Sequence, residues 1–247
     1  MQRPRRNSPA APPRRYAGAV SMWVAAFTLL AGVALPAAHP AETSNISAAR
    51  LFSRHDEPLQ SFRCYRRMHA WAERMGQEAW LDAWTELKGG AFRYTVVSER
   101  GSDSVRTKVL HAILDRETDA VNGGEAGRGE LTPDNYEFGA AGVDGDGSRY
   151  VSLRPKRKDV MLVDGRMVLS ADGSDLVRVE GRLSKNPSFW TTLVNVVRHY
   201  ARVGGVRVPT AVESVAKVRF AGTAQLEMFY EYETVNGRPV GLTAQRR

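Results

Sequence analysis

The most constraining feature of this chain is the stretch of residues 135–234, in which apolar and polar side chains alternate in short segments. Successive side chains of a β-strand point to opposite faces of a sheet, so this alternation predicts half-buried strands. Residues that favour turns separate the segments, as in consecutive antiparallel hairpins. A sheet of this many strands usually curls. The pattern therefore favours a container for something apolar over a site for bond-making.

One stretch before this run has the period of a helix instead. Residues 105–121 carry an apolar stripe, and the charged side chains lie elsewhere on the helical wheel. The stripe consists of Val105, Val109, Ala112, Ile113, Ala120 and Val121. Gly101-Ser102-Asp103-Ser104 offers capping side chains before the helix, and Asn122-Gly123-Gly124 favours a left-handed stop after it. We expect this helix to bury one side and to cover the sheet.

The first 41 residues have the composition of an export signal or an N-terminal anchor. Five arginines and no acidic residue precede a charge-free run at residues 16–38. A basic head followed by an apolar run is typical of a signal peptide, and this run is also long enough to span a bilayer. Val33 stands where a lipoprotein signal needs its acylated cysteine. We therefore expect export to the periplasm or cell envelope, by cleavage or with an anchor retained.

The remaining residues, 42–247, are expected to form a single domain. Without the leader the chain has 30 basic against 27 acidic residues, so its charge does not call for nucleic acid. Cys64 is the only cysteine, which excludes an intrachain disulfide. Stability must therefore come from burial of an ordinary core, which a chain of this length can supply.

About eleven strands are predicted from the alternation, and residues 47–52 are predicted as a short helix. Asp164-Gly165 lies between two apolar runs, as a two-residue hairpin turn requires. The expected fold is mainly β, a curved antiparallel half-barrel with a helical lid over its concave face. The strand segments are residues 61–71, 79–87, 91–98, 135–138, 149–154, 160–163, 166–169, 176–183, 191–200, 206–220 and 225–234.

This order of elements resembles the LolA/LolB-like half-barrels, the outer-membrane lipoprotein carriers and their exported relatives. The local strings that carry the resemblance are residues 135–138, the Asp164-Gly165 segment leading into residues 176–181, Pro187-Ser188-Phe189-Trp190, and residues 204–209. The resemblance implies an apolar cavity that receives acyl chains in the periplasm, with no cofactor and no metal. It assigns no lid-fastening arginine and no protruding apolar loop to particular residues of this chain.

A site for acyl chains needs no sequence motif, because apolar area holds the ligand. Each buried methylene contributes about 0.8 kcal/mol, so ten of them contribute about 8 kcal/mol before costs. Flexible and aromatic side chains suit such a lining. The alternative is that the same side chains pack a solid core. The candidate lining residues are Phe92, Tyr94, Val109, Ile113, Tyr136, Phe138, Met161, Met167, Met228 and Tyr230.

Other groupings of reactive residues are weaker. Cys64 and His69 lack the further ligands of a metal site. Ser102, His111 and Asp115 have the residue types of a hydrolase triad, but the nucleophile elbow G-x-S-x-G is missing. Asp144 and Asp146 imitate the start of a calcium loop whose later positions do not match. The basic segment 154–158 is a solvated turn or a contact for lipid phosphates or an acidic partner.

The sequence therefore predicts a non-enzymatic binding protein of the cell envelope, of the lipoprotein-sorting or lipid-transfer type, without catalytic residues. Its expected partner is a lipid or a lipidated protein, captured and released by movement of the helix. Contact with a membrane would be transient or made through the N-terminal segment. One alternative is an envelope-stress sensor, or protein-interaction module, on the same fold. The other is an uncharacterised hydrolase.

Overall fold

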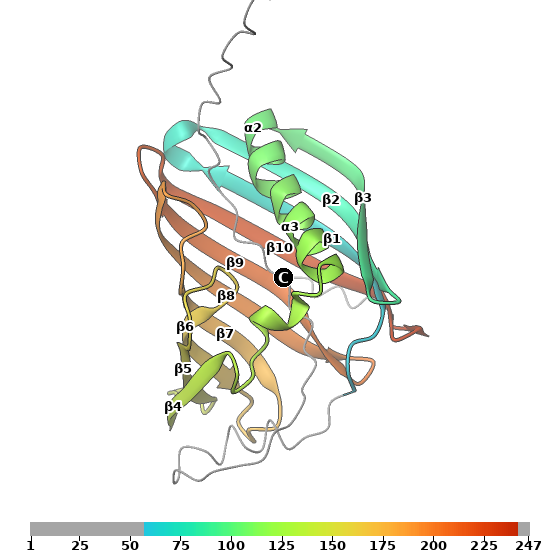
Figure 1. Ribbon diagram of the computed structural model, residues 1–247, viewed down its shortest axis with the longest axis vertical. Coiled ribbons are helices and arrows are strands. Elements are labelled where there is room, and N and C mark those ends of the chain that lie inside the picture. Colours follow the sequence, from blue (N-terminus) through green and yellow to red (C-terminus); the bar gives the residue numbers. More distant parts are fainter. Residues whose placement is uncertain (1–56, 242–247) are drawn as a thin grey trace, which may run out of the picture.

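The computed structural model describes residues 57–241, which form one antiparallel sheet with a helix lying across it (Figure 1). The strands are β1 (Phe62–Ala72), β2 (Gln77–Lys88), β3 (Ala91–Gly101), β4 (Tyr136–Val143), β5 (Arg149–Pro155), β6 (Val163–Leu169), β7 (Leu176–Leu183), β8 (Thr191–Val203), β9 (Val206–Val218), β10 (Gly222–Val235) and β11 (Arg238–Pro239). The helical segments are η1 (Glu73–Met75), α2 (Asp103–Val105), η2 (Arg106–His111), α3 (Ala112–Asn122) and η3 (Ala126–Gly129).

Most neighbouring strands of the sheet follow one another in the chain, and the first and last long strands meet inside the sheet. Its strand order is β3-β2-β1-β10-β9-β8-β7-β6-β5-β4, and β11 pairs with β10. Every neighbouring pair is antiparallel, and the β1–β10 pairing joins the first and last long strands. The edges β3 and β4 do not pair with each other in the described part of the chain, so the sheet stays open. The expected mainly-β half-barrel with few helices is confirmed.

A single helical rod runs from α2 through η2 into α3 and packs mainly on β1, β2 and β3 (Figure 1). It begins at Asp103 and ends at Asn122, close to the predicted bounds of 105 and 121. Its middle segment, η2, is a π-helix, an irregularity that the spacing of apolar residues does not reveal. No helix within residues 57–241 is long and apolar enough to cross a membrane.

The alternation of the sequence gives the sheet an inner face under the helix and an outer face. In β1, Cys64, Arg66, Met68 and Ala70 are buried, whereas the residues that alternate with them are more exposed. In β2, Leu81 and Ala83 are likewise buried against the helix side. The inner side chains of both halves of the sheet join one core, which also takes in Val105, Val109, Ile113 and Val121 of the helical stripe. At about 25 cal/mol per Å² of apolar surface, this core is the main stabilising contribution.

Most predicted strands are confirmed, but the hairpin expected around Asp164-Gly165 is wrong. Both residues lie inside β6, where Asp164 pairs with Arg182 and Gly165 with Gly181. Residues 160–162, predicted as strand, belong to the loop before β6, and the turn after β6 covers residues 170–175. The count of eleven strands therefore agrees only because the two-residue β11 replaces the strand that is missing.

A close approach of two strands explains why glycine occupies position 165. A Cβ atom there would lie 2.1 Å from the carbonyl oxygen of Glu180 and 2.6 Å from the Cα of Gly181. Gly181 has φ +153 and would meet the backbone of β6 in the same way. Glycine therefore serves the contact between β6 and β7, and not a turn.

Two other predictions fall outside the described residues. The export signal or anchor at residues 1–41 and the short helix at residues 47–52 both precede residue 57. They remain predictions from the sequence.

Gly165→Ala is expected to destabilise the protein by about 2 kcal/mol or more, because the strands must separate to accept the methyl group. The free energy of unfolding in urea measures this change. Gly145→Ala is the matched control, because a Cβ at that turn position meets nothing within 4 Å. Equal stability of the two variants would contradict the close approach.

Candidate functional site

The candidate site is the space between the helix and the inner face of the sheet. Polar contacts tie one side of the helix to the edge strand β3. Asn122 accepts a hydrogen bond from the backbone N–H of Phe92 at 2.8 Å and donates to its carbonyl oxygen at 3.2 Å. The Tyr94 hydroxyl donates to Asp115 at 2.6 Å. Glu99 binds Arg106 and His111 at 2.7 Å each. The helix is thus fastened along its length to β3.

A buried ion pair fastens the helix to the centre of the same region. The Arg66 guanidinium, on β1, forms two hydrogen bonds with the carboxylate of Glu117, on α3, one of them 2.7 Å long. Both residues are almost completely buried, at 2% and 3% exposure. The rings of Tyr230 and Phe92 lie 4.7 and 5.4 Å from the guanidinium carbon. We call Arg66 and Glu117 the latch.

The latch keeps Arg66 charged in a place that is otherwise apolar. Burial alone would lower the pKa of Arg66, but the adjacent Glu117 carboxylate more than offsets this and raises it above its usual value. Removing either partner would leave one charge buried without compensation. The Nε of Arg66 is buried and has no hydrogen-bond partner among the described residues.

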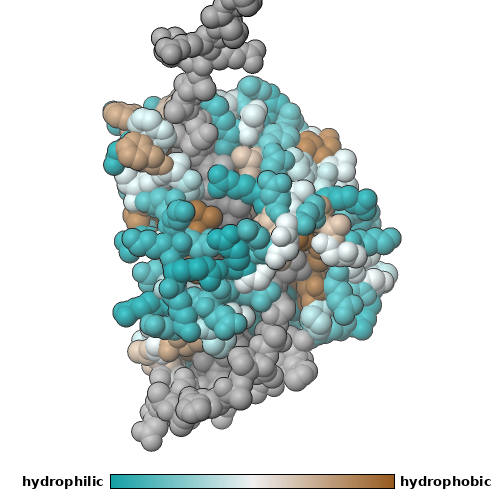
Figure 2. Space-filling view, viewed as in Figure 1, coloured by the Kyte–Doolittle hydropathy of each residue, from teal (hydrophilic) through white to brown (hydrophobic). Residues whose placement is uncertain are grey.

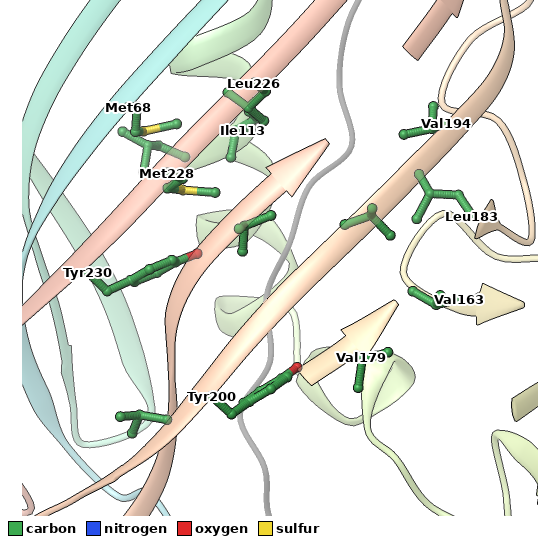
Figure 3. Packing of buried hydrophobic residues seen from close by; sticks show 14 of the residues in the cluster. Met68, Ile113, Val163, Val179, Leu183, Val194, Tyr200, Leu226, Met228 and Tyr230 are labelled. Carbon is green, nitrogen blue, oxygen red and sulfur yellow. The ribbon is translucent and has the colours of Figure 1, made fainter. Parts of the chain in front are cut away.

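The buried stripe of the helix that ends in Glu117 also carries Val109 and Ile113, and these two residues face β8, β9 and β10. A small pocket of about 30 Å³ lies here, under Val109 and Ile113 of the helix. Figure 3 shows Ile113 next to Leu226 and Met228 of β10, with Val194 of β8 further along the same face. The remaining lining is mostly apolar or small: Pro187, Thr191, Ser214, Ala216, Ala224 and Gln225. We call the contact between the helix and β8–β10 the apolar seam.

Several buried polar side chains lie on the part of the inner face that the helix does not cover. Arg198 of β8 is buried, and its Nη2 donates to the carbonyl oxygen of Met161 at 3.3 Å. The Tyr136 hydroxyl accepts a hydrogen bond from the N–H of Val163 at 3.0 Å. Burial raises the pKa of Tyr200 and of Tyr230 above the ordinary value of 10.0. The inner face therefore combines apolar surface with hydroxyl and guanidinium donors.

A second, polar cleft of about 440 Å³ lies at the C-terminal end of the helix. It separates Arg116 and Asp119 of α3 from the loop that carries Asp159 and Met161. Arg128 bridges this cleft, because it binds both Glu125 and Asp159 at 2.8 Å. Its charges are mixed, so it does not select for one kind of ligand charge.

The predicted lining residues do not surround one cavity. Val109 and Ile113 line the small pocket, and Met228 lies beside it (Figure 3). Phe92 and Tyr230 flank the latch instead. The other five occupy different parts of the fold: Tyr94 bonds to the helix, Met161 borders the polar cleft, Met167 is fully buried in β6, and Tyr136 lies 6.4 Å from Phe138 between ring centroids.

The structure separates the residues of the weaker groupings. Cys64 is buried on the inner face, whereas His69 lies on the outer face between Trp71 and Trp80. His111 pairs with Glu99, and Asp115 accepts its hydrogen bond from Tyr94. Within residues 57–241, no three His, Cys, Asp or Glu side chains gather in a way that fits a metal ion.

Sequence reasoning missed the latch, although a signal for it exists. Arg66 follows Cys64 and precedes Met68 at intervals of two, so it shares their inward phase in β1. Glu117 is four residues after Ile113 on the helix and therefore lies on the same buried side. Two opposite charges on facing buried surfaces predict a pair.

The outer face of β1 and β2 carries an aromatic ladder. His69 stacks between Trp71 and Trp80, with ring centroids 4.4 and 4.6 Å apart, and Arg100 lies over Trp80 at 4.3 Å. Further along, Tyr65 meets Trp84 edge to face at 5.1 Å, and Arg63 covers that indole at 4.0 Å. We call these five aromatic residues, Tyr65, His69, Trp71, Trp80 and Trp84, the outer ladder.

Glu117→Gln is expected to lower the free energy of unfolding by about 3–5 kcal/mol, because Arg66 loses its buried countercharge. Urea unfolding checks this value. Glu78→Gln is the matched control: Glu78 pairs with His69 at 2.9 Å on the surface, and its loss should cost less than about 1 kcal/mol. If the two substitutions cost the same, the latch is not the fastening that its burial indicates.

The free energy of unfolding is expected to fall in alkaline solution, because the buried thiol of Cys64 holds its proton more tightly in the folded state. Burial raises the pKa of the Cys64 thiol from 9.0 to about 12, so the folded state holds this proton more tightly than the unfolded state. The contribution is complete below pH 9.0 and is lost as the pH rises toward about 12. Unfolding of Cys64→Ala should therefore depend less steeply on pH in this window than unfolding of the wild type. Identical slopes would contradict the thiol's role.

Comparisons with known proteins add no identity to this geometry. No family model matches the chain, and neither a curated protein nor a solved structure matches it.

Proposed function

We propose that this protein is a non-enzymatic binding protein of the cell envelope that holds the acyl chain of a lipid or lipoprotein between its helix and its sheet. The observation that carries the proposal is the asymmetry of the helix. One side is fastened to β3, whereas the buried stripe with Val109 and Ile113 lies against β8–β10 at the apolar seam, and Glu117 of the latch follows on the same stripe. Location in the envelope is proposed from residues 1–41.

This asymmetry supports a movable lid. Displacing the helix from β8–β10 breaks apolar contacts and loosens the latch, and an acyl chain restores apolar contacts of the same kind. Displacing it from β3 would break the bonds of Asp115, Glu99 and Asn122. The helix would therefore tilt about its β3 side and open at the seam.

The size of the pocket requires such a movement. Its volume of about 30 Å³ corresponds to roughly one water molecule, which is too small for an acyl chain. Ten methylenes would contribute about 8 kcal/mol before costs. That exceeds the roughly 3–5 kcal/mol at stake in a complete loss of the latch. The free energy gained by burying the acyl chain therefore exceeds the cost of loosening the latch.

The π-helical segment η2 lies where the helix would adjust. It includes Val109, which lines the pocket, and it directly precedes α3, which carries Ile113 and Glu117. Single π-helical turns inside α-helices are frequent at functional sites. A change of η2 toward α-helix would rotate Val109 relative to Ile113 and alter the seam.

The direct experiment measures binding of a fluorescent fatty acid to purified, delipidated protein. We expect Ser214→Trp, whose indole is larger than the pocket and would obstruct the seam from β9, to weaken binding about tenfold or more. Val215→Trp is the matched control, because the neighbouring side chain is 38% exposed and points to the outer face. Circular dichroism confirms that both variants remain folded.

Mass spectrometry of organic extracts supplies a second readout. The proposal expects stoichiometric lipid in extracts of the wild type. A wild-type protein that binds no fatty acid and carries no lipid would contradict it, and so would equal binding by Ser214→Trp and Val215→Trp.

The outer ladder favours a second candidate, a protein-interaction module of the envelope-stress sensor kind. Trp, Tyr and Arg dominate the binding energy of protein interfaces, and here they cover the outer face of β1 and β2. This candidate expects a lipid-free protein with one envelope partner, whose binding is lost in Trp80→Ala and Trp84→Ala and retained in Ser214→Trp.

A further inference from the structure

Three turns at one end of the sheet present large apolar side chains to solvent. They are η1 between β1 and β2, the loop before β8, and the turn between β9 and β10. Phe220 is 84% exposed, Phe189 is 73% exposed and Met75 is 44% exposed. Single exposed apolar residues are ordinary, but a contiguous group of them marks an interaction surface. We call this group the apolar tip.

The three turns touch one another, so the tip is one surface. Trp190 lies between Phe189 and Phe220, with ring centroids 5.4 and 5.9 Å away. The backbone N–H of Arg219 donates to the carbonyl oxygen of Trp190 at 2.9 Å. On the other side, Gly222 lies against the side chain of Arg74 in η1. Figure 2 shows hydrophobic residues gathered at this end, where Figure 1 places these turns.

The backbone holds Phe220 outward at a conformational cost. Its φ of +68 lies in the left-handed region, which a bulky side chain rarely adopts. Nothing buries the ring in return, because most of it faces solvent. Strained backbone of this kind clusters at functional sites.

The charges around the tip have one sign on its aromatic side. Lys185 lies in the loop before β8, and Lys217 and Arg219 flank Phe220. Residues 184–191 and 217–223 contain no acidic residue. Aromatic rings beside Lys and Arg are the composition that contacts the surface of an anionic bilayer, where rings enter the interface and cations meet lipid phosphates.

The tip also lies at the entrance of the apolar seam. Pro187 from the loop before β8, Thr191 from the start of β8, and Ala224 and Gln225 from the start of β10 line the small pocket directly beneath these turns. A tip embedded in a bilayer would therefore place the opening of the seam at the level of the acyl chains.

We propose that the apolar tip, formed by Met75, Phe189 and Phe220 with Trp190 packed between the two phenylalanines, docks on the surface of a bilayer that contains anionic lipids. This inference rests on the proposed function, because it assigns the place at which an acyl chain passes between membrane and seam. A protein partner at the same surface is the competing outcome.

The test uses an environment-sensitive fluorophore attached to an introduced cysteine in the full chain. Cys64, the native cysteine, is fully buried and its pKa is raised to about 12, so the label goes to the introduced site. Met75→Cys places the label in the tip. Val143→Cys places it at the opposite end of the meander, at a residue that is 66% exposed. A label at Val143 also controls for any attachment through residues 1–41.

We expect vesicles of phosphatidylcholine with about one third phosphatidylglycerol to blue-shift the label at position 75 and to leave the label at position 143 unchanged. Phe189→Ser combined with Phe220→Ser should weaken the response about tenfold, and Arg219→Glu or high salt should also reduce it. Both phenylalanines are largely exposed, so the double variant should stay folded, which a thermal melt checks.

Three results would overturn the inference: no response at position 75, an equal response at position 143, or a response that the double variant retains. Capture of a protein by the tip without a response to vesicles would also overturn it. Binding of a fluorescent fatty acid in solution, measured on the same samples, reports on the proposed function separately. A protein that binds the fatty acid but not the vesicle keeps the proposed function and loses this inference.

Discussion

The Arg66–Glu117 pair is the interaction on which the arrangement of helix and sheet depends. It joins residues 51 positions apart, is nearly inaccessible to water, and lies against the rings of Phe92 and Tyr230. A buried pair need not stabilise a fold more than apolar residues would, but it specifies one geometry, because a displaced partner leaves an unpaired charge. The helix therefore has one defined seat on β1–β3, and its freedom is confined to the side that faces β8–β10.

The fold was largely readable from the sequence, because period-two alternation reports directly on which side of a strand is buried. The limits of β7 are those predicted, and those of the helix differ from the prediction by one or two residues. The hairpin predicted at Asp164-Gly165 is the exception. Asp164-Gly165 has the local chemistry of a turn, yet Gly165 is needed where β6 and β7 approach closely. A glycine allows both uses, and only the distant partner Gly181 decides between them.

The candidate site was less readable, because it depends on pairs of residues that are far apart in the sequence. Ten apolar positions were predicted to line a cavity, but apolar character reports burial and does not distinguish a wall from a packed core. Ile113 and Val109 meet the pocket, whereas Met167 is fully buried in β6. Arg66 carried a usable signal, its inward phase among apolar neighbours. The apolar tip carried none, because its three turns meet only through the order of the strands.

In the proposed function, the helix opens at the apolar seam while its β3 side stays fastened. Hydrogen–deuterium exchange of the protein with and without a long-chain fatty acid tests it most directly. We predict that exchange changes in η2, α3 and the facing segments of β8–β10, and stays the same in β3 and in the β6–β7 pair. Unchanged exchange along the seam at a saturating concentration of the fatty acid, or an equal change in β3, would contradict it.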